Sequence, residues 1–353
     1  MDQYEYNHTP MPNGDGGQWD PSLGETGEVK PPRNLGRIKL QIGMPLVAVA
    51  FIFVCSIVSY NVLAVLAYLL MPQSPLLEEM WFSMALSSFS MYGIAMPLSL
   101  LLYRCVPAKP IEKRDMSLPT LLGVIGICFL LTYAGSYMGN FLNTLIGMFT
   151  GEMPDNDLAE TTSQMSFWFN LLFTAILAPI FEEIFYRKLL LDRIAQYGEL
   201  PAILISGIGF GLIHGNFYQF FYAAMVGILL GYVYLKTGKL RYSIAIHMIL
   251  NFIGGVYTSE MLKELEPYYA ANGSGLGMLQ SINGFLMMLS YYFFMAAVII
   301  GGITAVILLW KRISFRRAED PLTGKEWTKV LLLNPATWIF LCVVVFMFVL
   351  ALL

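Results

Sequence analysis

Long apolar runs constrain this chain more than any other feature of its sequence. Hydrophobic residues make up 57% of the 353 residues and charged residues only 13%. A run of about 20 apolar residues is long enough to cross a bilayer as a helix, and a backbone inside hydrocarbon must satisfy its own hydrogen bonds. The apolar segments lie at roughly 42–70, 82–103, 118–149, 165–186, 201–214, 217–235, 242–258, 279–310 and 330–353. The sequence therefore predicts an all-α, polytopic transmembrane helical bundle of about eight or nine spans.

The segment 201–214 is shorter than the others. It offers about 14 residues, or roughly 21 Å of helix. We therefore expect it either to stop inside the bilayer or to pack as a hairpin with the segment 217–235.

Nearly all Lys and Arg residues lie in every second segment that connects the expected spans. This distribution predicts the orientation of the chain in the membrane. Twenty of the 21 Lys and Arg residues fall on one side of the expected spans, and Lys263 falls on the other. The opposite set of loops carries Glu78, Glu152 and Glu260. By the positive-inside rule the N-terminus is cytoplasmic, and the protein is an integral, multi-pass membrane protein.

The chain divides by composition into four parts. Residues 1–40 contain almost no apolar run and are rich in Gly, Pro and Asn, which favours a disordered, flexible cytoplasmic tail. We expect N-terminal transmembrane helices over 41–150, a catalytic core over 151–260, and C-terminal transmembrane helices over 261–353. The first apolar run is too long for a cleavable signal peptide.

Glycines recur every four residues in several spans, as in Gly207, Gly211 and Gly215, or Gly135 and Gly139. Small residues at this spacing give a smooth helix face on which another backbone can pack closely. We expect these faces to be helix–helix contacts.

The first group of ionisable residues within the spans is Glu182, Glu183 and Arg187. Glu183 and Arg187 are four residues apart, so on a helix they share a face and can form an ion pair. Glu182 points about 100° away, which leaves it as a candidate general base. The alternative is that all three lie at the cytoplasmic interface and extend their charges to water.

Two further groups each contain one histidine. His214 follows Phe210 by four residues, and His247 precedes Asn251 by four. A lone histidine is often a hydrogen-bonded packing residue. His247 and Asn251 share a helix face, however, and two polar donors there suit stabilisation of a developing oxyanion. The alternative for this pair is hydrogen bonding between helices.

Taken in order, these groups resemble the CPBP family of intramembrane proteases, which includes CAAX prenyl endopeptidases and bacterial Abi proteins. The family pattern EExxxR, FxxxH, HxxxN is matched by Glu182, Glu183 and Arg187, then by Phe210 and His214, then by His247 and Asn251. The resemblance covers roughly residues 165–258.

The resemblance implies a hydrolase that cleaves a peptide bond of a membrane-associated substrate. Glu182 and His214 would position and activate a water, and His247 and Asn251 would hold the tetrahedral oxyanion. Glu183, Arg187 and Phe210 would be supporting residues. The expected partners are membrane lipid and a peptide or protein substrate, lipidated or not, with no nucleic acid.

Members of this family are often described as metalloproteases, and His214, His247 and Glu182 could form a His2Glu zinc site with one open position. No HExxH spacing is present, and a metal-free mechanism uses the same residues. We therefore assign no firm cofactor, although zinc fits chemically.

Two non-proteolytic functions stay open. The family also contains members thought to act as immunity or regulatory scaffolds. A transporter would use intramembrane Glu, Arg and His as well, but it would need a continuous polar path, and the first, second, third, eighth and ninth expected spans carry no charged residue.

Overall fold

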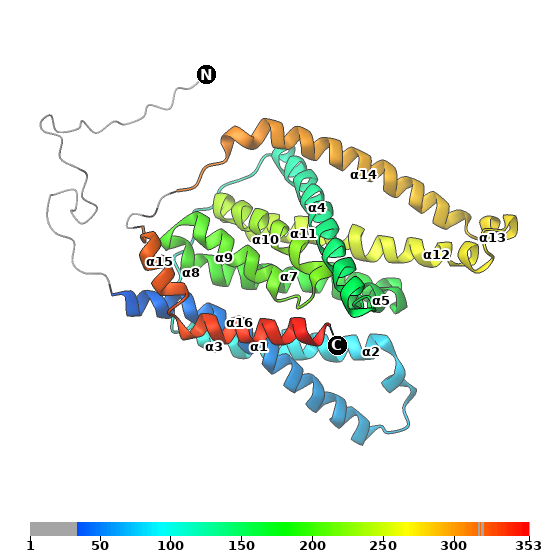
Figure 1. Ribbon diagram of the computed structural model, residues 1–353, viewed down its shortest axis with the longest axis horizontal. Coiled ribbons are helices and arrows are strands. Elements are labelled where there is room, and N and C mark those ends of the chain that lie inside the picture. The colour runs from blue at the N-terminus through cyan, green and yellow to red at the C-terminus, as the bar shows by residue number, and fades with distance from the viewer. Residues whose placement is uncertain (1–33, 317, 319–320, 353) are drawn as a thin grey trace, which may run out of the picture. The chain divides into compact units, whose positions relative to one another are not determined.

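The computed structural model describes residues 34–316, 318 and 321–352, and Figure 1 shows the course of the chain. The described residues form helices and no strand, as the apolar segments predict. Residues Gly36–Leu353 form one compact unit. The main helices are α1 (Leu35–Leu70), α2 (Met80–Ser88), α3 (Met96–Tyr103), α4 (Leu118–Thr150), α5 (Asp157–Gln164), α7 (Ala178–Glu183), α9 (Glu199–Leu212), α10 (Phe217–Thr237), α11 (Leu240–Asn251), α12 (Thr258–Ala270), α14 (Ile282–Leu309), α15 (Gly324–Leu331) and α16 (Pro335–Leu350).

The structure has fewer candidate membrane spans than the nine apolar segments of the sequence. Six of the described helices are long and apolar enough to cross a membrane, or seven if α15 and α16, bent by 61°, count as one span. The segment 201–214 becomes α9, a shorter apolar helix, and a short connection joins it to α10 as the expected hairpin. The segment 242–258 is divided among α11, a π-helical turn and α12, and none of these is a candidate span.

Residues 1–33 of the expected tail over 1–40 lie outside the described residues. Helix α1 begins at Leu35, so residues 35–40 are helical, and the boundary at 40 remains a prediction. The subdivision into 41–150, 151–260 and 261–353 remains a prediction.

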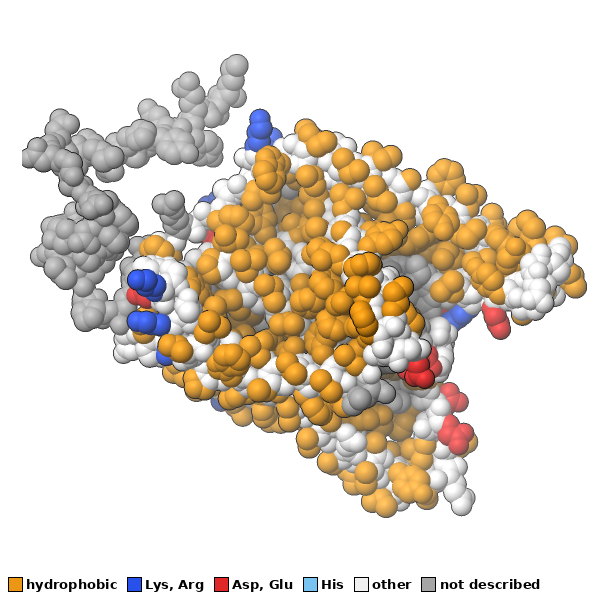
Figure 2. Space-filling model, viewed as in Figure 1, with side chains coloured by type: hydrophobic (Ala, Val, Ile, Leu, Met, Phe, Trp, Pro, Cys, Tyr) orange, Lys and Arg blue, Asp and Glu red, His pale blue; other side chains and the backbone are white. Residues whose placement is uncertain are grey.

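Charged side chains lie at the two ends of the face shown in Figure 2, and hydrophobic side chains cover the region between. Most of the visible Lys and Arg side chains lie near α15, and most of the visible Asp and Glu side chains lie at the opposite end. This separation agrees with the sorting of charge along the sequence. The cytoplasmic N-terminus remains a prediction from that sorting.

Helix α10 packs between α9 and α4, and glycines allow the close approach. A Cβ at Gly211 would lie 2.6 Å from the backbone oxygen of Phe220, and a Cβ at Gly139 would lie 2.3 Å from that of Phe217. No side chain fits at such distances, so these glycine faces are helix contacts, as expected. Gly215 differs from that expectation, because it lies outside the helices with a φ of 69° in the turn between α9 and α10.

The span Phe167–Tyr197 is one continuous helical segment with two wider, π-helical stretches. These are η3 (Leu171–Leu177), which ends just before Pro179, and η4 (Ile184–Leu191), which begins just after Glu183. The chain passes through a π-helical turn before Pro179, whose missing N–H cannot donate to the preceding turn. Such turns are frequent at functional sites.

Candidate active site

Glu183 and Arg187 form a buried ion pair, as the sequence spacing predicts. Neither side chain is exposed, and Arg187 donates from Nε to Glu183 Oε2 at 3.0 Å and from Nη2 to Oε1 at 3.3 Å. Two parallel bonds of this kind fix both side chains in one geometry. The burial excludes the alternative in which these two residues extend their charges to interfacial water.

A third residue completes the surroundings of Arg187. Its Nη1 donates to Ser206 Oγ at 2.7 Å, and Ser206 in turn donates to the backbone oxygen of Tyr186 at 3.0 Å. Ser206 belongs to α9 and is fully buried. It therefore ties the ion pair of one helix to the neighbouring helix. Sequence reasoning missed Ser206, although a serine within an apolar helical run was a usable signal.

Phe210 occupies the centre of the site. The guanidinium carbon of Arg187 lies 5.4 Å from its ring centroid. The rings of His214 and His247 meet it edge-on, at centroid distances of 5.1 and 5.6 Å. One aromatic ring thus holds the arginine and both histidines in place through cation–π and edge-to-face contacts.

His247 lies between the two glutamates. Its Nδ1 is 3.2 Å from Glu183 Oε1, and its Nε2 is 3.7 Å from Glu182 Oε2. Both ring nitrogens face carboxylate oxygens, and an imidazolium with its two N–H donors matches that arrangement. The sequence placed His247 beside Asn251, and the structure adds its contact with both carboxylates.

His214 lies just after the end of α9, in the turn that leads to α10. Its Nδ1 is 2.8 Å from the backbone oxygen of Phe210. A carbonyl can only accept, so this contact places the ring hydrogen on Nδ1 and leaves the lone pair on Nε2. The next helix starts at once, because the Asn216 side chain accepts from Gln219 N and caps α10.

Asn251 ends α11, and the π-helical turn η6 (Phe252–Tyr257) follows it. Its Nδ2 donates to the backbone oxygen of Thr174, in η3, at 3.0 Å. This bond links two helices, as the alternative interpretation of Asn251 proposed. The amide has a second N–H, which remains available for another acceptor.

These residues surround one cavity of about 510 Å³. Glu182, Phe210, His214, His247 and Asn251 all contribute to its wall, which also includes polar side chains from α4 and α10 such as Thr132, Gln219 and Tyr222. Glu182 is partly exposed, at 18% of its side chain, whereas Glu183 is not exposed at all. The expected difference between the two carboxylates is therefore present.

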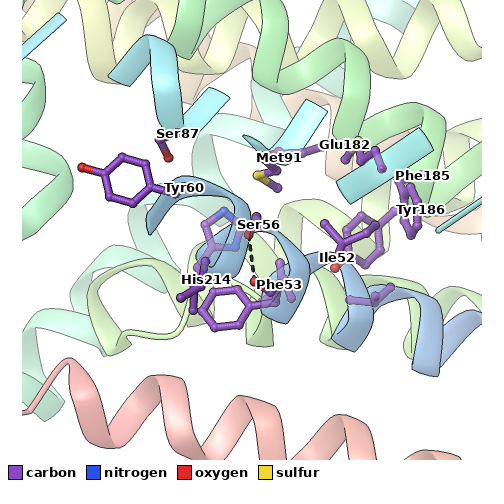
Figure 3. A pocket seen from close by; sticks show the side chains of 14 residues that line it. Ile52, Phe53, Ser56, Tyr60, Ser87, Met91, Glu182, Phe185, Tyr186 and His214 are labelled. Carbon is purple, nitrogen blue, oxygen red and sulfur yellow. Dashed lines mark hydrogen bonds between the residues drawn. The ribbon is translucent and has the colours of Figure 1, made fainter. Parts of the chain in front are cut away.

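A second cavity, of about 330 Å³, meets the first at Glu182 and His214. Figure 3 shows both residues beside side chains of α1, including Ile52, Phe53 and Ser56. Sequence reasoning did not place α1 at the site. A long apolar span carries no pattern that indicates which of its side chains line a cavity.

No group of three His, Cys, Asp or Glu side chains in the described residues is arranged to hold a metal ion. His214, His247 and Glu182, the set that would form a His2Glu zinc site, therefore do not converge as three ligands. His247 turns its Nδ1 toward the buried Glu183, a contact that metal-binding histidines also make. The lack of convergence among the three side chains is therefore the reason that this arrangement does not fit zinc.

Comparison with known proteins points to peptidases. Residues 164–253 match a family model described as "Type II CAAX prenyl endopeptidase Rce1-like". The chain is also 23% identical over 194 residues to the Bacillus subtilis (strain 168) protein named "Putative membrane peptidase YdiL", an alignment that covers 54% of this chain and 76% of that protein. No solved structure matches the chain significantly.

The matched region contains every residue of the three motifs, from Glu182 to Asn251. It also contains the buried ion pair, the two histidines and the aromatic ring between them. Residues 164–253 of this chain are therefore similar to the Rce1-like endopeptidase family, which agrees with the resemblance that the three motifs carry.

Proposed function

We propose that this protein is an intramembrane endopeptidase that uses Glu182 to activate a water molecule. The observation that carries the proposal is the position of Glu182. It is the carboxylate that Arg187 does not hold, and it lines a cavity together with His214, His247 and Asn251. A general base must be able to reach water and substrate, and Glu182 is the glutamate of the motif that faces open space.

The same geometry supports roles for the other residues. Glu182, with His214 beside the same cavity, takes a proton from water as the water oxygen attacks the carbonyl carbon. His247 and the second N–H of Asn251 donate to the oxyanion that forms. The proton then passes to the leaving amine as the C–N bond breaks. Glu183 and Arg187 hold the helix and His247 in place.

Cleavage by the purified full-length chain tests the proposal. The protein, reconstituted in lipid, is incubated with a mixture of synthetic membrane peptides, with and without a lipid group, and the products are identified by mass spectrometry. We expect products from the wild type and none from Glu182→Ala. The control is Glu152→Ala, which removes an exposed carboxylate outside both cavities and should leave cleavage unchanged.

Two results would contradict the proposal. Equal cleavage by the wild type and Glu182→Ala would remove Glu182 from the reaction. A folded wild type that cleaves no peptide, lipidated or not, would favour the alternative of a membrane scaffold or an immunity or regulatory protein.

A further inference from the structure

The two ends of the bundle differ in charge. We call the end that carries Glu152 and Glu260 the acidic end, and the end that carries Lys236 and Lys239 the basic end. Figure 1 shows α5 and α12 at one end and α15 at the other, and in Figure 2 most of the visible acidic side chains lie away from α15. The positive-inside rule assigns the basic end to the cytoplasm.

The larger cavity lies toward the acidic end of α10. This helix runs from the acidic end to the basic end, and Gln219 and Tyr222 in its first two turns line the cavity. Closer to the basic end, Leu230 and Val233 are buried. Because buried apolar side chains are close-packed, this half of α10 leaves no passage for a peptide.

The motif helices show the same division. Glu182 lines the cavity, but Arg187 and Ile194, which follow it toward the basic end, are not exposed at all. On α11, Ile246 is likewise fully buried, and the cavity wall begins one residue later, at His247. Packed side chains and a buried ion pair therefore close the path from Glu182 to the basic end, and opening either would be costly.

Toward the acidic end the cavity continues beyond the motif residues. Leu158 of α5 and Thr258, at the start of α12, belong to its wall together with Glu182. Both lie in segments that connect spans at the acidic end. One cavity thus joins the candidate base to the acidic end of the bundle.

Residues 151–164, which we call the strap, cross this end of the cavity. The Tyr218 hydroxyl of α10 donates to the backbone oxygen of Pro154 at 2.9 Å, and Ser259 Oγ of α12 donates to that of Thr162 at 2.8 Å. Leu158 lies between these two anchors and faces the cavity. Among the described side chains of the strap only Thr162 is buried, and a segment with so few buried contacts can open locally at low free energy.

We propose that the substrate reaches Glu182 from the acidic end, as the strap moves away from the cavity. The inference rests on the proposed function and names its substrate class: a peptide whose scissile bond lies on the side of the membrane opposite the cytoplasm or in that half of the bilayer. A tail presented only from the cytoplasm would meet the packed basic end. Residues 151–163 of the strap lie outside the matched segment 164–253, so the family match does not supply this entrance.

The first test blocks the strap. Leu158→Cys, in the full-length protein, is coupled to a bulky maleimide and assayed with a membrane peptide that the wild type cleaves. We expect kcat/KM to fall by more than about tenfold, which corresponds to about 1.4 kcal/mol of barrier. The matched controls are Ser163→Cys, on the same helix, and Lys113→Cys, at the basic end. Both positions are exposed and line neither cavity, so their labels should leave cleavage unchanged.

The wild type treated with the same reagent gives the effect of the four native cysteines. Thermal unfolding of each labelled protein shows whether it is folded.

The second test needs no change at the cavity. The protein is reconstituted in vesicles of each orientation, and a maleimide that cannot cross the membrane identifies them: it reacts with Ser163→Cys when the acidic end is outside and with Lys113→Cys when the basic end is outside. The cleavable peptide, extended by a hydrophilic tail that keeps it from crossing, is added outside. We expect cleavage only where the acidic end faces the peptide.

Each outcome decides the inference. Cleavage only where the basic end faces the peptide, or cleavage from both sides, overturns the assigned entrance while the proposed endopeptidase stands. An unchanged rate for a folded, labelled Leu158→Cys protein overturns the role of the strap. Failure of the wild type to cleave any peptide in detergent overturns the proposed function, which is a separate result.

Discussion

Two adjacent glutamates on one helix lie in opposite surroundings. Glu183 is fully buried, bonded twice to Arg187 and in contact with His247. Glu182 is partly exposed and borders both cavities. Adjacent residues of one type can therefore lie in different surroundings, one in a buried ion pair and the other at a cavity wall. We propose that Glu183 supports the structure and that Glu182 acts as the base.

The largest effect should come from the side of the helix that faces the cavities. Glu182→Gln keeps the size of the side chain and removes its ability to accept a proton. We expect peptide hydrolysis to fall by more than about 100-fold, the lower range for loss of a general base, while thermal unfolding in detergent stays unchanged. Full activity in this variant would show that Glu182 is not the general base.

The next effect should come from the buried side. Arg187→Ala leaves Glu183 without its buried cation, which costs about 3 to 5 kcal/mol. The unfolding temperature in detergent should fall together with activity. The double variant Glu183→Gln with Arg187→Met should be less destabilised, because neither uncompensated charge remains. If stability is unchanged and only turnover falls, the Glu183–Arg187 pair acts in catalysis or substrate binding and not in holding the structure.

A smaller loss of stability is expected at Ser206, which contacts the ion pair through Arg187. Ser206→Ala removes the acceptor of Arg187 Nη1, and a hydrogen bond to a charged group contributes about 1.5 to 3 kcal/mol. The free energy of unfolding should decrease by an amount in that range. Ser163→Ala, at an exposed position, is the control and should change stability by less than about 0.5 kcal/mol. Equal values for both variants would mean that Ser206 does not support the pair.

Removal of metal ions should have the smallest effect on activity. The proposed roles of His214 and His247 need no ion, so the purified protein should contain less than one equivalent of zinc and keep its activity after dialysis against a strong chelator. Elemental analysis checks the first point and the peptide assay the second. Stoichiometric zinc that is lost together with activity in His214→Ala would restore the His2Glu site and make Glu182 a ligand or its base.

Much of the fold could be predicted because hydrophobic length and helical periodicity are local properties. The apolar runs predicted helices, and the spacing of Glu183 and Arg187 predicted their pairing, which the structure confirms. Six or seven of the described helices are long and apolar enough to cross a membrane, fewer than the nine apolar segments of the sequence. Hydrophobicity does not show that α9 is a short hairpin helix or that α11 continues through a π-helical turn into α12. The roles of Glu182, His214, His247 and Asn251 remain predictions.

The sequence by itself determined that this chain is a membrane protein of helices, and which few polar residues its spans contain. Tertiary structure decided what surrounds those residues. It placed His247 between two glutamates that are 64 and 65 residues away in the chain, and it brought α1 to the site as the wall of a second cavity. The physical reason is that one helix fixes the relative directions of its own side chains, whereas contacts between spans depend on how separate helix faces fit together.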